Sequence, residues 1–538
     1  METLEKPDKS LNWAHPLIRQ WFIDKLGSPS EAQKQGWPAI LSGQATLISA
    51  PTGSGKTFAA FLVAINHLVQ KSITGNLKNE TEILYVSPLK ALSNDIQKNL
   101  MTPLNDIMAM ADAKGLSMEQ IRVAVRTSDT SPYERQSMLK KPPHILVTTP
   151  ESLYILLTAE KSRQMLMNVK TVIVDEIHAL ADDKRGAHLS LSLERLQSIT
   201  QQIPVRIGLS ATQKPIEIVA NFLTGNYLPP PVIINIGHTK QMELVVEVPS
   251  SELGAVASNE MWDEIYDRLA ELAEQNRSTL IFVNTRRAAE RAAHRLAERL
   301  GKDQVAAHHG SLSRKLRVTA ETKLKNGELK ALVATASLEL GIDIGTVDLV
   351  CQLGSPRSIA VMLQRVGRAG HWYGAISKGH IFATTRDELL ECAALVNAIQ
   401  AGDLDQLIIP NEPIDILMQQ IIAACATEDW LEDELFTMVK GSFHYRTLSR
   451  DLFNRVIEIL SEGIAGARGR YGAYLFRDQV NGLVKARRGS RLTAITSGGA
   501  IPENGLFTVI SAPTGVMVGT LDEDFAVESN RGDIILLG

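Results

Sequence analysis

The chain has 538 residues, of which 44% are hydrophobic and 22% charged, and its 56 lysines and arginines nearly balance 60 aspartates and glutamates, for a formal charge of -4. At roughly 100–200 residues per domain, this length predicts about three or four domains and excludes a single small fold. The apolar fraction excludes a disordered chain, and the balanced charge means that any nucleic-acid surface must be local.

The cysteines and the first residues of the chain indicate the cellular compartment. Cys351, Cys392 and Cys425 stand far apart and form no Cys-x-x-Cys pair, which favours a reducing compartment over a disulfide framework or a zinc site. The N-terminus lacks the apolar stretch of a signal peptide, and no apolar run is long enough to cross a bilayer. We therefore expect a soluble, cytoplasmic protein with no membrane partner.

In the first part of the chain, short runs rich in Val, Ile and Leu alternate with longer helical patterns. The predicted strands are 45–50, 82–87, 144–149, 170–175 and 205–210. This alternation is typical of a mostly parallel sheet with helices on both faces. Because the prolines near its end cannot continue a helix, we predict that a first α/β domain spans residues 1–235.

A second series of the same kind predicts a second α/β domain over residues 236–405. Its predicted elements are a helix at 261–275, strands at 279–285, 330–335, 348–353 and 380–384, and a helix-rich end at 387–401. Residues 406–500 are expected to form a small helical module. Residues 501–538 have strand-like runs at 507–510, 515–521 and 533–537, so we expect them to begin a β-rich domain that is cut short.

The strongest motif is Ala-Pro-Thr-Gly-Ser-Gly-Lys-Thr at 50–57, which follows a predicted strand and precedes a helical run. Its glycines let backbone N–H groups converge on phosphate oxygens, Lys56 supplies a charge for the β- and γ-phosphates, and the Thr57 hydroxyl is placed to bind Mg²⁺. Ala50 stands where the usual pattern has glycine. The pattern predicts a site for ATP with Mg²⁺, and the open alternative is a glycine-rich turn with a solvated lysine. The predicted phosphate-binding residues are Thr52, Gly53, Ser54, Gly55, Lys56 and Thr57.

A phosphate loop needs a carboxylate at the end of a neighbouring strand, and Val-Ile-Val-Asp-Glu-Ile-His at 172–178 provides it. We expect Asp175 to hold Mg²⁺ through water and Glu176 to act as the general base for the attacking water. The alternative is a pair of acidic residues that cap a helix.

These two motifs belong to a longer ordered series. It continues with Ser-Pro-Leu-Lys-Ala-Leu at 87–92, Thr-Thr-Pro-Glu-Ser at 148–152, Ser-Ala-Thr at 210–212, and four runs in the second half at 282–286, 308–311, 334–343 and 364–371. Over residues 30–385 this order resembles the superfamily 2 helicases. The details at 308–312, 370–371 and 520–526 resemble the large helicase-related (Lhr) proteins within that superfamily.

The resemblance implies two tandem RecA-like domains, a winged-helix domain over the helical module and a further C-terminal domain. It also implies ATP-driven 3′-to-5′ movement on single-stranded DNA, duplex unwinding and a role in DNA repair. We expect a monomer acting on single strands and tailed duplexes, with RNA–DNA hybrids as possible substrates.

The resemblance also assigns roles to individual residues. Gln33 matches the glutamine that reads adenine, and Asp343 matches a nucleotide contact. Arg368 is the first candidate for the arginine finger and Arg365 the second, because His371 replaces the second arginine of many relatives. The implied coupling residues are Ser210 and Thr212, and the implied strand contacts are Thr149, Arg286, Ser311 and Thr335. The open alternatives are surface ion-pair arginines and ordinary loop residues.

The stretch 461–500 is basic in a chain that is acidic overall. It holds Arg468, Arg470, Arg477, Lys485, Arg487, Arg488 and Arg491 against Glu462 and Asp478, with Tyr471, Tyr474 and Phe476 among them. This composition suits phosphates and base stacking, so we predict nucleic-acid contacts at Arg487 and Arg488. The alternative is a solvated face over a local core. For the adjacent His308 and His309 we expect no metal, because neighbouring strand side chains point to opposite faces.

Three other functions stay open. A non-hydrolysing nucleic-acid scaffold is disfavoured by the presence of Lys56, Asp175, Glu176 and Arg368 together. A metabolic kinase with a phosphate loop has no need of the second motif-bearing sheet. An RNA helicase is the nearest alternative, because contacts to phosphates alone distinguish sugars poorly.

Overall fold

The computed structural model describes residues 9–51, 53–88, 97–237, 241–254, 257–339, 347–370, 376–466, 469–500 and 506–522. The chain divides into two compact units. One consists of Met1–Ala50, Ser54–Gly237 and Gln406–Ile501, and the other of Pro51–Gly53, His238–Asp405 and Pro502–Gly538.

The first unit is built on a seven-stranded sheet in the order β3-β4-β2-β5-β6-β1-β7. Every pairing in it is parallel. Its strands are β1 (Thr46–Ser49), β2 (Ile83–Val86), β3 (Val123–Arg126), β4 (Ile145–Thr148), β5 (Thr171–Val174), β6 (Val205–Ser210) and β7 (Val232–Asn235). The central strands are almost continuously buried, as expected for a parallel sheet covered on both faces.

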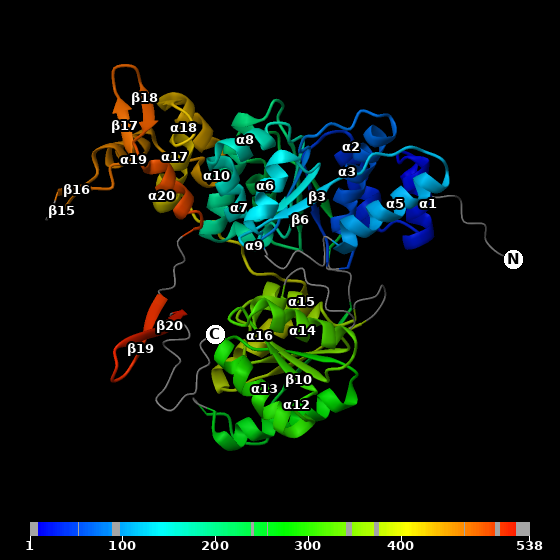
Figure 1. Ribbon diagram of the computed structural model, residues 1–538. Helices are drawn as coiled ribbons and strands as arrows, with labels where there is room; N and C mark the ends of the chain where they lie inside the picture. Colours follow the sequence, from blue (N-terminus) through cyan, green and yellow to red (C-terminus); the bar gives the residue numbers. More distant parts are fainter. Residues whose placement is uncertain are drawn as a thin grey trace. The chain divides into compact units, whose positions relative to one another are not determined.

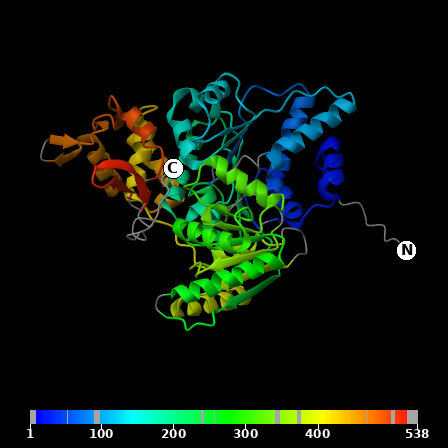
Figure 2. The same cartoon turned by 60° about the horizontal axis from the view of Figure 1, so that its bottom comes forward.

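Helices cover both faces of this sheet (Figures 1 and 2). One face carries α1 (Pro16–Leu26), α2 (Glu31–Leu41), α3 (Lys56–Ile73) and α5 (Thr102–Ala113), the last preceded by the short turn η2 (Gln97–Met101). The other carries α7 (Pro150–Thr158), α8 (Glu160–Leu166), α9 (His178–Ala181), α10 (Lys184–Ile199) and α11 (Ile216–Thr224). Helix α6 (Pro132–Lys140) follows β3. Alternate strand residues serve the two cores, since Ile48 packs with the first set of helices and Leu47 with the second.

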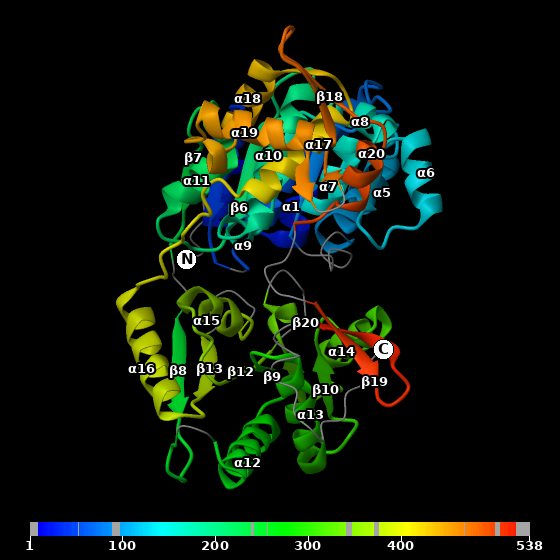
Figure 3. The same cartoon turned by 90° about the vertical axis from the view of Figure 1, so that its left-hand side faces the viewer.

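The second unit contains a six-stranded parallel sheet in the order β10-β11-β9-β12-β13-β8, most of which is visible in Figure 3. Its strands are β8 (Met242–Glu247), β9 (Thr279–Phe282), β10 (Val305–His308), β11 (Ala331–Ala334), β12 (Leu349–Leu353) and β13 (Ser377–Phe382). Its helices are α12 (Asn259–Gln275), α13 (Arg286–Leu300), η3 (Ala336–Leu338), α14 (Arg314–Lys325), α15 (Ile359–Val366) and α16 (Arg386–Ala401). The two parallel sheets expected from the sequence are thus confirmed.

All nine predicted strands of the two sheets are present, but four further strands were not predicted. These are β3, β7, β8 and β10. Each of the four is an edge strand of its sheet. Edge strands are only half-buried, so their sequences mix polar with apolar residues and lack the continuous apolar run that marked the central strands.

Residues 406–501 belong to the first unit and combine helices with a small antiparallel sheet, in keeping with the expected winged helix. The helices are α17 (Ile414–Cys425), α18 (Glu432–Gly441), η4 (Phe443–Tyr445), α19 (Arg450–Glu462) and α20 (Ser490–Thr496). The sheet has the order β14 (Trp430–Leu431), β18 (Leu483–Ala486), β17 (Leu475–Asp478), and a separate ribbon pairs β15 (Ile464–Gly466) with β16 (Gly469–Tyr471). In the second unit, the predicted runs at 507–510 and 515–521 form the hairpin β19 (Leu506–Ser511) and β20 (Val516–Asp522), whereas 533–537 lies outside the described residues.

The winged-helix module lies against α10 of the first domain, and its helix α17 runs beside α10 in Figure 3. Buried polar contacts join the two parts. The Arg195 Nη1 donates to Gln420 Oε1 at 2.9 Å, and Gln420 Nε2 donates to the carbonyl oxygen of His188 at 3.0 Å. At Gly441 the two parts approach so closely that a Cβ would lie 2.5 Å from Glu194 Oε2. Because these buried groups satisfy one another, separating the module from the domain would leave them unpaired.

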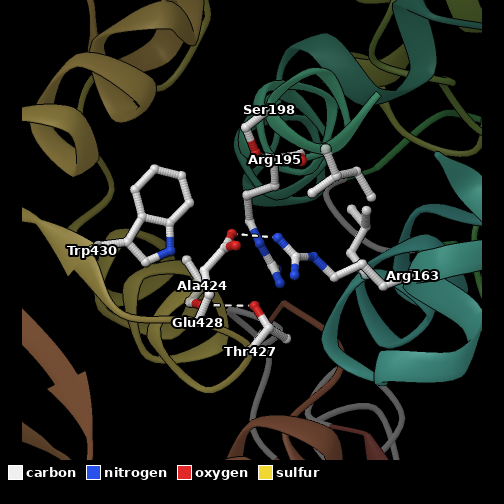
Figure 4. A pocket seen from close by; sticks show the side chains of 9 residues that line it. Arg163, Arg195, Ser198, Ala424, Thr427, Glu428 and Trp430 are labelled. Atoms are coloured by element: carbon white, nitrogen blue, oxygen red, sulfur yellow. Dashed lines mark hydrogen bonds and ion pairs between the residues drawn. The ribbon is translucent and has the colours of Figure 1, made fainter. Parts of the chain in front are cut away.

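Figure 4 shows a small pocket at this same contact. Arg163 forms an ion pair with Glu428, and Arg195 Nη2 donates to the carbonyl oxygen of Ala423 at 3.2 Å. The Thr427 hydroxyl donates to Ala424 O at 2.8 Å. The charged groups of the pocket are therefore all bonded within the protein, and we assign the pocket to the interface and not to a ligand.

A buried carboxylate stabilises the sheet at the start of β2. The side chain of Glu82 is 1% exposed and accepts hydrogen bonds from Lys71 at 2.7 Å, Lys170 at 2.9 Å and His67 at 3.2 Å. Burial opposes ionisation, but the hydrogen bonds from His67, Lys170 and Lys71 outweigh it and hold the pKa of Glu82 well below its usual range. The ion cluster ties α3 to the amino ends of β2 and β5.

We predict that Glu82→Gln lowers the free energy of unfolding by about 3 kcal/mol, because two lysines lose their buried counter-ion. The folded-state pKa lies below the unfolded-state value, so the stabilisation is complete at neutral pH and is lost as the pH falls below about 4.3. Urea unfolding at several pH values measures both effects. Glu80→Gln is the control, since Glu80 lies 3.9 Å from Lys170 and should contribute little. Equal stability of Glu82→Gln and wild type at pH 7 would contradict the prediction.

Candidate active site

The order of the first sheet gathers three predicted motifs at one edge. Strands β5, β6 and β1 are consecutive and parallel, so their carboxyl ends lie side by side. Residues 50–57 follow β1, residues 175–178 follow β5, and Ser210 ends β6. In open parallel sheets ligands bind outside this edge.

The loop after β1 has the backbone that phosphate binding requires. Gly53 and Gly55 have φ values of 82° and 80°, in the left-handed region, and Gly55 is the N-cap of α3. The positive φ disfavours any side chain at Gly55, and a Cβ there would lie 2.7 Å from Gln33 Nε2. The loop thus presents the N-terminus of a long helix, where backbone N–H groups favour an anion. Thr52 lies outside the described residues, and Ala50, in place of the usual glycine, is fully buried.

The side chains of this loop fit a polyphosphate. Lys56 is 5% exposed, and its amine makes no hydrogen bond or ion pair with any residue that the structure describes. The Ser54 hydroxyl is buried and also has no partner among the described residues. Buried polar groups without partners are costly, and phosphate oxygens would satisfy both. Thr57, the predicted Mg²⁺ ligand, is half-buried at the start of α3.

Asp175 and Glu176 lie where β5 ends. Asp175 Oδ1 accepts a hydrogen bond from the Glu176 N–H at 2.9 Å, and Oδ2 accepts one from the hydroxyl of Tyr85. Burial, with the neighbouring charge of Glu176, raises the pKa of Asp175 to about 6, although Lys56 opposes this rise. Lys56 is therefore electrostatically coupled to Asp175.

Glu176 has an uncommon backbone conformation. Its φ is 45°, in the left-handed region that only glycine adopts freely, so the position stores roughly 1–3 kcal/mol of strain. Non-glycine residues in this region are frequent at functional sites. The conformation directs the side chain of Glu176 to within 3.6 Å of His178 Nδ1.

His178 connects the β5 motif with the Ser-Ala-Thr motif after β6. Its Nδ1 accepts a hydrogen bond from the Ala211 N–H at 3.2 Å. Burial lowers the pKa of His178 to about 4, although Glu176 opposes this shift, so the ring is neutral and its proton is on Nε2. The hydroxyls of Ser210 and Ser49 both donate to the Ala211 carbonyl, at 2.7 and 3.2 Å. Ala211 is thus bonded to groups from β1, β5 and β6.

Gln33 lies close to the phosphate loop. It is 5% exposed, its Oε1 accepts from the Ser30 N–H at 2.9 Å, and its Nε2 donates to Gly55 O at 3.3 Å. The bond from the Ser30 N–H is one half of a capping box at the start of α2, and the Gln33 N–H donates to Ser30 Oγ at 3.4 Å in the other half. The two bonds of the side chain fix the amide in one orientation. Each amide atom keeps one further hydrogen-bonding position for a ligand.

In the second unit, the two candidate arginines have different environments. The Arg365 guanidinium is bound by the side chains of Glu339, Gln352 and Asn284 and lies over the Phe282 ring at 5.1 Å. Arg368 Nη2 donates to the carbonyl oxygen of Glu339 at 2.6 Å. Arg365 is therefore an internal ion-pair residue of its domain. Asp343 and His371 lie outside the described residues.

The structure brings two of the predicted strand contacts together. Arg286 Nη1 donates to Ser311 Oγ at 3.0 Å in the second unit. Thr335 is 8% exposed and precedes η3. In the first unit Thr149 is the N-cap of α7, where its hydroxyl accepts from the Ser152 N–H at 3.4 Å.

The basic side chains of the winged-helix module divide into those that are bonded within the module and those without such bonds among the described residues. Arg487 donates to the carbonyl oxygens of Leu475 at 2.6 Å and Ser461 at 3.0 Å, which favours the structural alternative for this residue. Arg477 and Lys485 form ion pairs with acidic residues of the module. Arg488 and Arg491 are exposed and have no such partner within the described part of the chain, so they remain the better nucleic-acid candidates. Arg468 lies outside that part.

The rings of the two adjacent histidines have different partners. His308 contacts Ser337 and Glu321, whereas His309 contacts Glu290, so each ring is paired with a different carboxylate. Within the described ranges, no three metal-ligating side chains converge. The same ranges include no helix with the length and apolar character needed to cross a bilayer.

Three family models match the chain in succession. The DEAD/DEAH box helicase model matches residues 30–219, and the helicase conserved C-terminal domain model matches residues 261–373. The winged helix domain model of the large helicase-related protein matches residues 397–538.

Known proteins match over nearly the whole chain. The ATP-dependent helicase Lhr-Core protein 2 of Thermococcus barophilus is 44% identical over 529 residues, which cover 97% of this chain and 61% of that protein. The Lhr helicase/probable uracil glycosylase of Mycolicibacterium smegmatis is 42% identical, over 97% of this chain and 37% of that protein. A solved structure of Mycobacterium smegmatis helicase Lhr bound to ssDNA and AMP-PNP matches with a TM-score of 0.85 and 43% identity, over 98% of this chain and 67% of that one. The chain belongs to the Lhr helicase family.

Membership of the Lhr family confirms the resemblance found in the sequence motifs. The chain spans 37% and 61% of the lengths of the two curated Lhr relatives. The succession of family models agrees with the two parallel sheets and the winged-helix module described above.

The sequence did not predict two residues of this Lhr domain as candidates for the site or its surroundings. Tyr85 lies on β2, is 2% exposed, stacks on Phe61 of α3 at 4.9 Å and donates to Asp175. Because a buried strand aromatic is ordinarily a core residue, its sequence carried no signal of this contact. Arg126 ends β3, a strand that the sequence pattern did not reveal.

We predict that Tyr85→Phe lowers the affinity for Mg²⁺ in the presence of nucleotide roughly 10–100-fold. Loss of the hydroxyl lets the carboxylate of Asp175, which is the expected metal ligand, reorient. Titration of Mg²⁺ against a fluorescent ATP analogue measures it. Tyr154→Phe is the matched control, since the Tyr154 hydroxyl is buried without a partner among the described residues. The role of Tyr85 would be disproved by identical Mg²⁺ titrations for both variants and wild type.

Proposed function

We propose that this chain is the motor of an ATP-dependent helicase that moves along single-stranded DNA with 3′-to-5′ polarity, unwinds tailed duplexes and acts in DNA repair. The observation that carries the proposal is the convergence of Lys56, Asp175 and Glu176 at the carboxyl ends of adjacent parallel strands. The similar M. smegmatis Lhr structure, described as bound to ssDNA and AMP-PNP, supports DNA and ATP as ligands. We further propose a cytoplasmic monomer.

In this proposal the nucleotide binds at the β1 edge of the sheet. ATP with Mg²⁺ supplies a γ-phosphoryl group that water can attack. Lys56 and the N-terminus of α3 neutralise phosphate charge, Thr57 and Asp175 hold Mg²⁺, and Gln33 contacts adenine. The further proposed contacts are Thr52, Gly53, Ser54, Gly55 and Asp343.

Glu176 is proposed to take the proton of the attacking water. Its strained backbone fixes the carboxylate beside neutral His178, which is bonded to Ala211. A movement of Glu176 on hydrolysis is thereby transmitted to the segment that holds Ser210 and Thr212. The Thr212 hydroxyl is buried and lacks a partner among the described residues, so it can acquire one when the segment moves.

Arg368 is proposed as the arginine finger, because a guanidinium stabilises the charge that develops on the transferred phosphoryl group. Arg365 is the weaker candidate, since three side chains of its own domain already bind it. The proposed strand contacts are Thr149, Arg286, Ser311, Thr335, Arg487 and Arg488. Arg487 is the weaker candidate of the last two, because its guanidinium already donates to two carbonyl groups of the module.

Two alternatives remain distinguishable by experiment. An RNA or RNA–DNA hybrid helicase would use the same phosphate contacts, because they do not depend on base identity. A non-hydrolysing scaffold would bind strands without releasing phosphate. Phosphate release measured with DNA, RNA and hybrid strands separates these possibilities.

The proposed site predicts different defects for two variants. Lys56→Ala should weaken ATP binding and lower strand-stimulated hydrolysis roughly 10²–10³-fold, because a phosphate counter-charge is lost. Glu176→Gln should keep ATP binding and lower hydrolysis roughly 10²–10⁴-fold, because only the base is lost. Equilibrium binding of a fluorescent nucleotide and steady-state phosphate release measure both. Exposed Lys161→Ala on α8 is the charge control. Wild-type turnover in either site variant would rule out this site.

The two arginines of the second unit should also differ. Arg368→Ala is expected to lower DNA-stimulated hydrolysis roughly 10³-fold while ATP and strand binding persist. Arg365→Ala should mainly lower thermal stability, because it leaves Glu339 without its ion-pair partner. Phosphate release and thermal unfolding of both variants decide the assignment. If Arg368→Ala retains stimulated hydrolysis, the finger is another residue.

A further inference from the structure

The linker between α16 and α17, residues 402–413, is attached to both units at consecutive residues. The division between the units falls between Asp405 and Gln406. Asp405 is bonded within the second unit, whereas Gln406 and Leu407 are bonded within the first. Because one peptide bond joins the two attachments, the linker has no slack at this point.

Within the second unit, Asp405 holds the start of α15. Its Oδ2 accepts hydrogen bonds from the Ser358 hydroxyl at 2.6 Å and from the Ala360 N–H at 2.9 Å. Ser358 is the N-cap of α15, where backbone N–H groups carry a partial positive charge that favours a carboxylate. The linker therefore supplies an additional acceptor for the first turn of this helix.

The backbone directly before α15 is strained and needs such support. Arg357 has a φ of 58°, in the left-handed region that non-glycine residues seldom adopt. Its N–H donates to Ser355 Oγ at 3.1 Å, and the Ser355 carbonyl oxygen accepts from Asn284 Nδ2 at 2.8 Å. Strained conformations persist only where surrounding bonds fix them. Together with the bonds of Asp405, these contacts determine where α15 begins.

Helix α15 leads to the two arginines of the proposed reaction. Arg365 lies in its last turn, and the Arg368 N–H donates to the Arg365 carbonyl oxygen at 3.0 Å, directly after the helix. Met362 and Val366 of the same helix are fully buried in a core of the second unit. Because packed interiors transmit strain, a force on the start of α15 is passed to the arginines at its end.

Within the first unit, the linker is bonded to the segment that follows β6. Gln406 pairs with Lys214 in an isolated parallel bridge, and the Leu407 N–H donates to the Lys214 carbonyl oxygen at 3.2 Å. The Leu407 side chain is buried in one of the two cores that cover the first sheet. The same segment includes Ala211, which is bonded to His178. The linker is thus joined to the segment that hydrolysis is proposed to move.

We propose that Asp405 is a positioning residue that couples the segment after β6 to the arginine helix α15. When hydrolysis shifts that segment, Lys214 moves Gln406, and Asp405 passes the movement across one peptide bond to the start of α15. The approach of Arg368 to the transferred phosphoryl group is thereby timed by the coupling segment. The inference rests on the proposed function and adds a covalent path between the two units.

Four variants test the coupling. Asp405→Ala removes both hydrogen bonds to α15, whereas Asp405→Asn should keep them, because a single oxygen accepts both. Insertion of two glycines between Asp405 and Gln406 leaves each attachment intact but adds slack, since glycine-rich chain is flexible. The same insertion between Asp403 and Leu404 is the matched control, because it lengthens the linker without separating the two attachments.

The measured quantity is the number of ATP molecules hydrolysed for each labelled strand displaced from a tailed DNA duplex. Asp405→Ala and the insertion after Asp405 should raise this number roughly tenfold, because ATP turnover continues while the arginine helix loses its timing. Asp405→Asn and the insertion after Asp403 should match wild type. Binding of a fluorescent nucleotide should be unchanged in all four variants, since none of them alters the phosphate loop.

Thermal unfolding separates coupling from a structural role. If Asp405 only stabilised the start of α15, Asp405→Ala would lower the melting temperature. The insertion after Asp405 keeps the bonds of Asp405, so it would then leave ATP consumption per displaced strand unchanged. Raised ATP consumption by the insertion variant at a wild-type melting temperature is the result that a structural role cannot produce.

The outcomes also separate this inference from the proposed function. If wild type displaces the strand and the insertion after Asp405 does so with the same ATP consumption, the inference fails and the proposed function stands. The inference also fails if the insertion after Asp403 raises ATP consumption equally, because linker length alone would then explain the effect. Failure of wild type to displace any strand with ATP would overturn the proposed function and the inference together.

Discussion

The parallel register of β5, β6 and β1 is the constraint on which the rest of the site depends. Because these strands are buried on both faces, a slip of one residue would move apolar side chains to the wrong core. The fixed register therefore fixes the relative positions of the strand ends. It brings Lys56 into electrostatic contact with Asp175 and places Ala211 against His178. The strand register, and not the conformation of any one loop, therefore sets this arrangement.

The same edge also concentrates features that weaken the fold. Glu176 has a left-handed backbone, Lys56 and Ser54 lack internal partners among the described residues, and Arg126 lacks a counter-ion. The two continuous cores on either face and the ion cluster around Glu82 offset these costs. In the function proposed above, a bound nucleotide would satisfy Lys56 and Ser54, which the described part of the chain leaves without partners.

The sequence predicted the features that depend on local pattern. Central strands were recognised as continuous Val, Ile and Leu runs, and the phosphate loop was recognised because it needs particular residues at fixed spacing. Features that depend on long-range contacts were missed: the edge strand β3 has a mixed sequence, Tyr85 resembles any core aromatic, and Arg126 ends an unpredicted strand. Composition likewise could not separate Arg487, which is bonded to two carbonyl groups, from Arg488, which has no such bond among the described residues.

In the proposed function, hydrolysis at the β1 edge drives movement along a single strand in one direction. Displacement of a labelled strand from matched 3′-tailed and 5′-tailed DNA duplexes tests it most directly, with wild type and Glu176→Gln side by side. Wild type should displace the strand only with ATP, Mg²⁺ and a 3′ tail, and Glu176→Gln should not displace it. Displacement by Glu176→Gln at the wild-type rate, or by wild type without ATP, would contradict it.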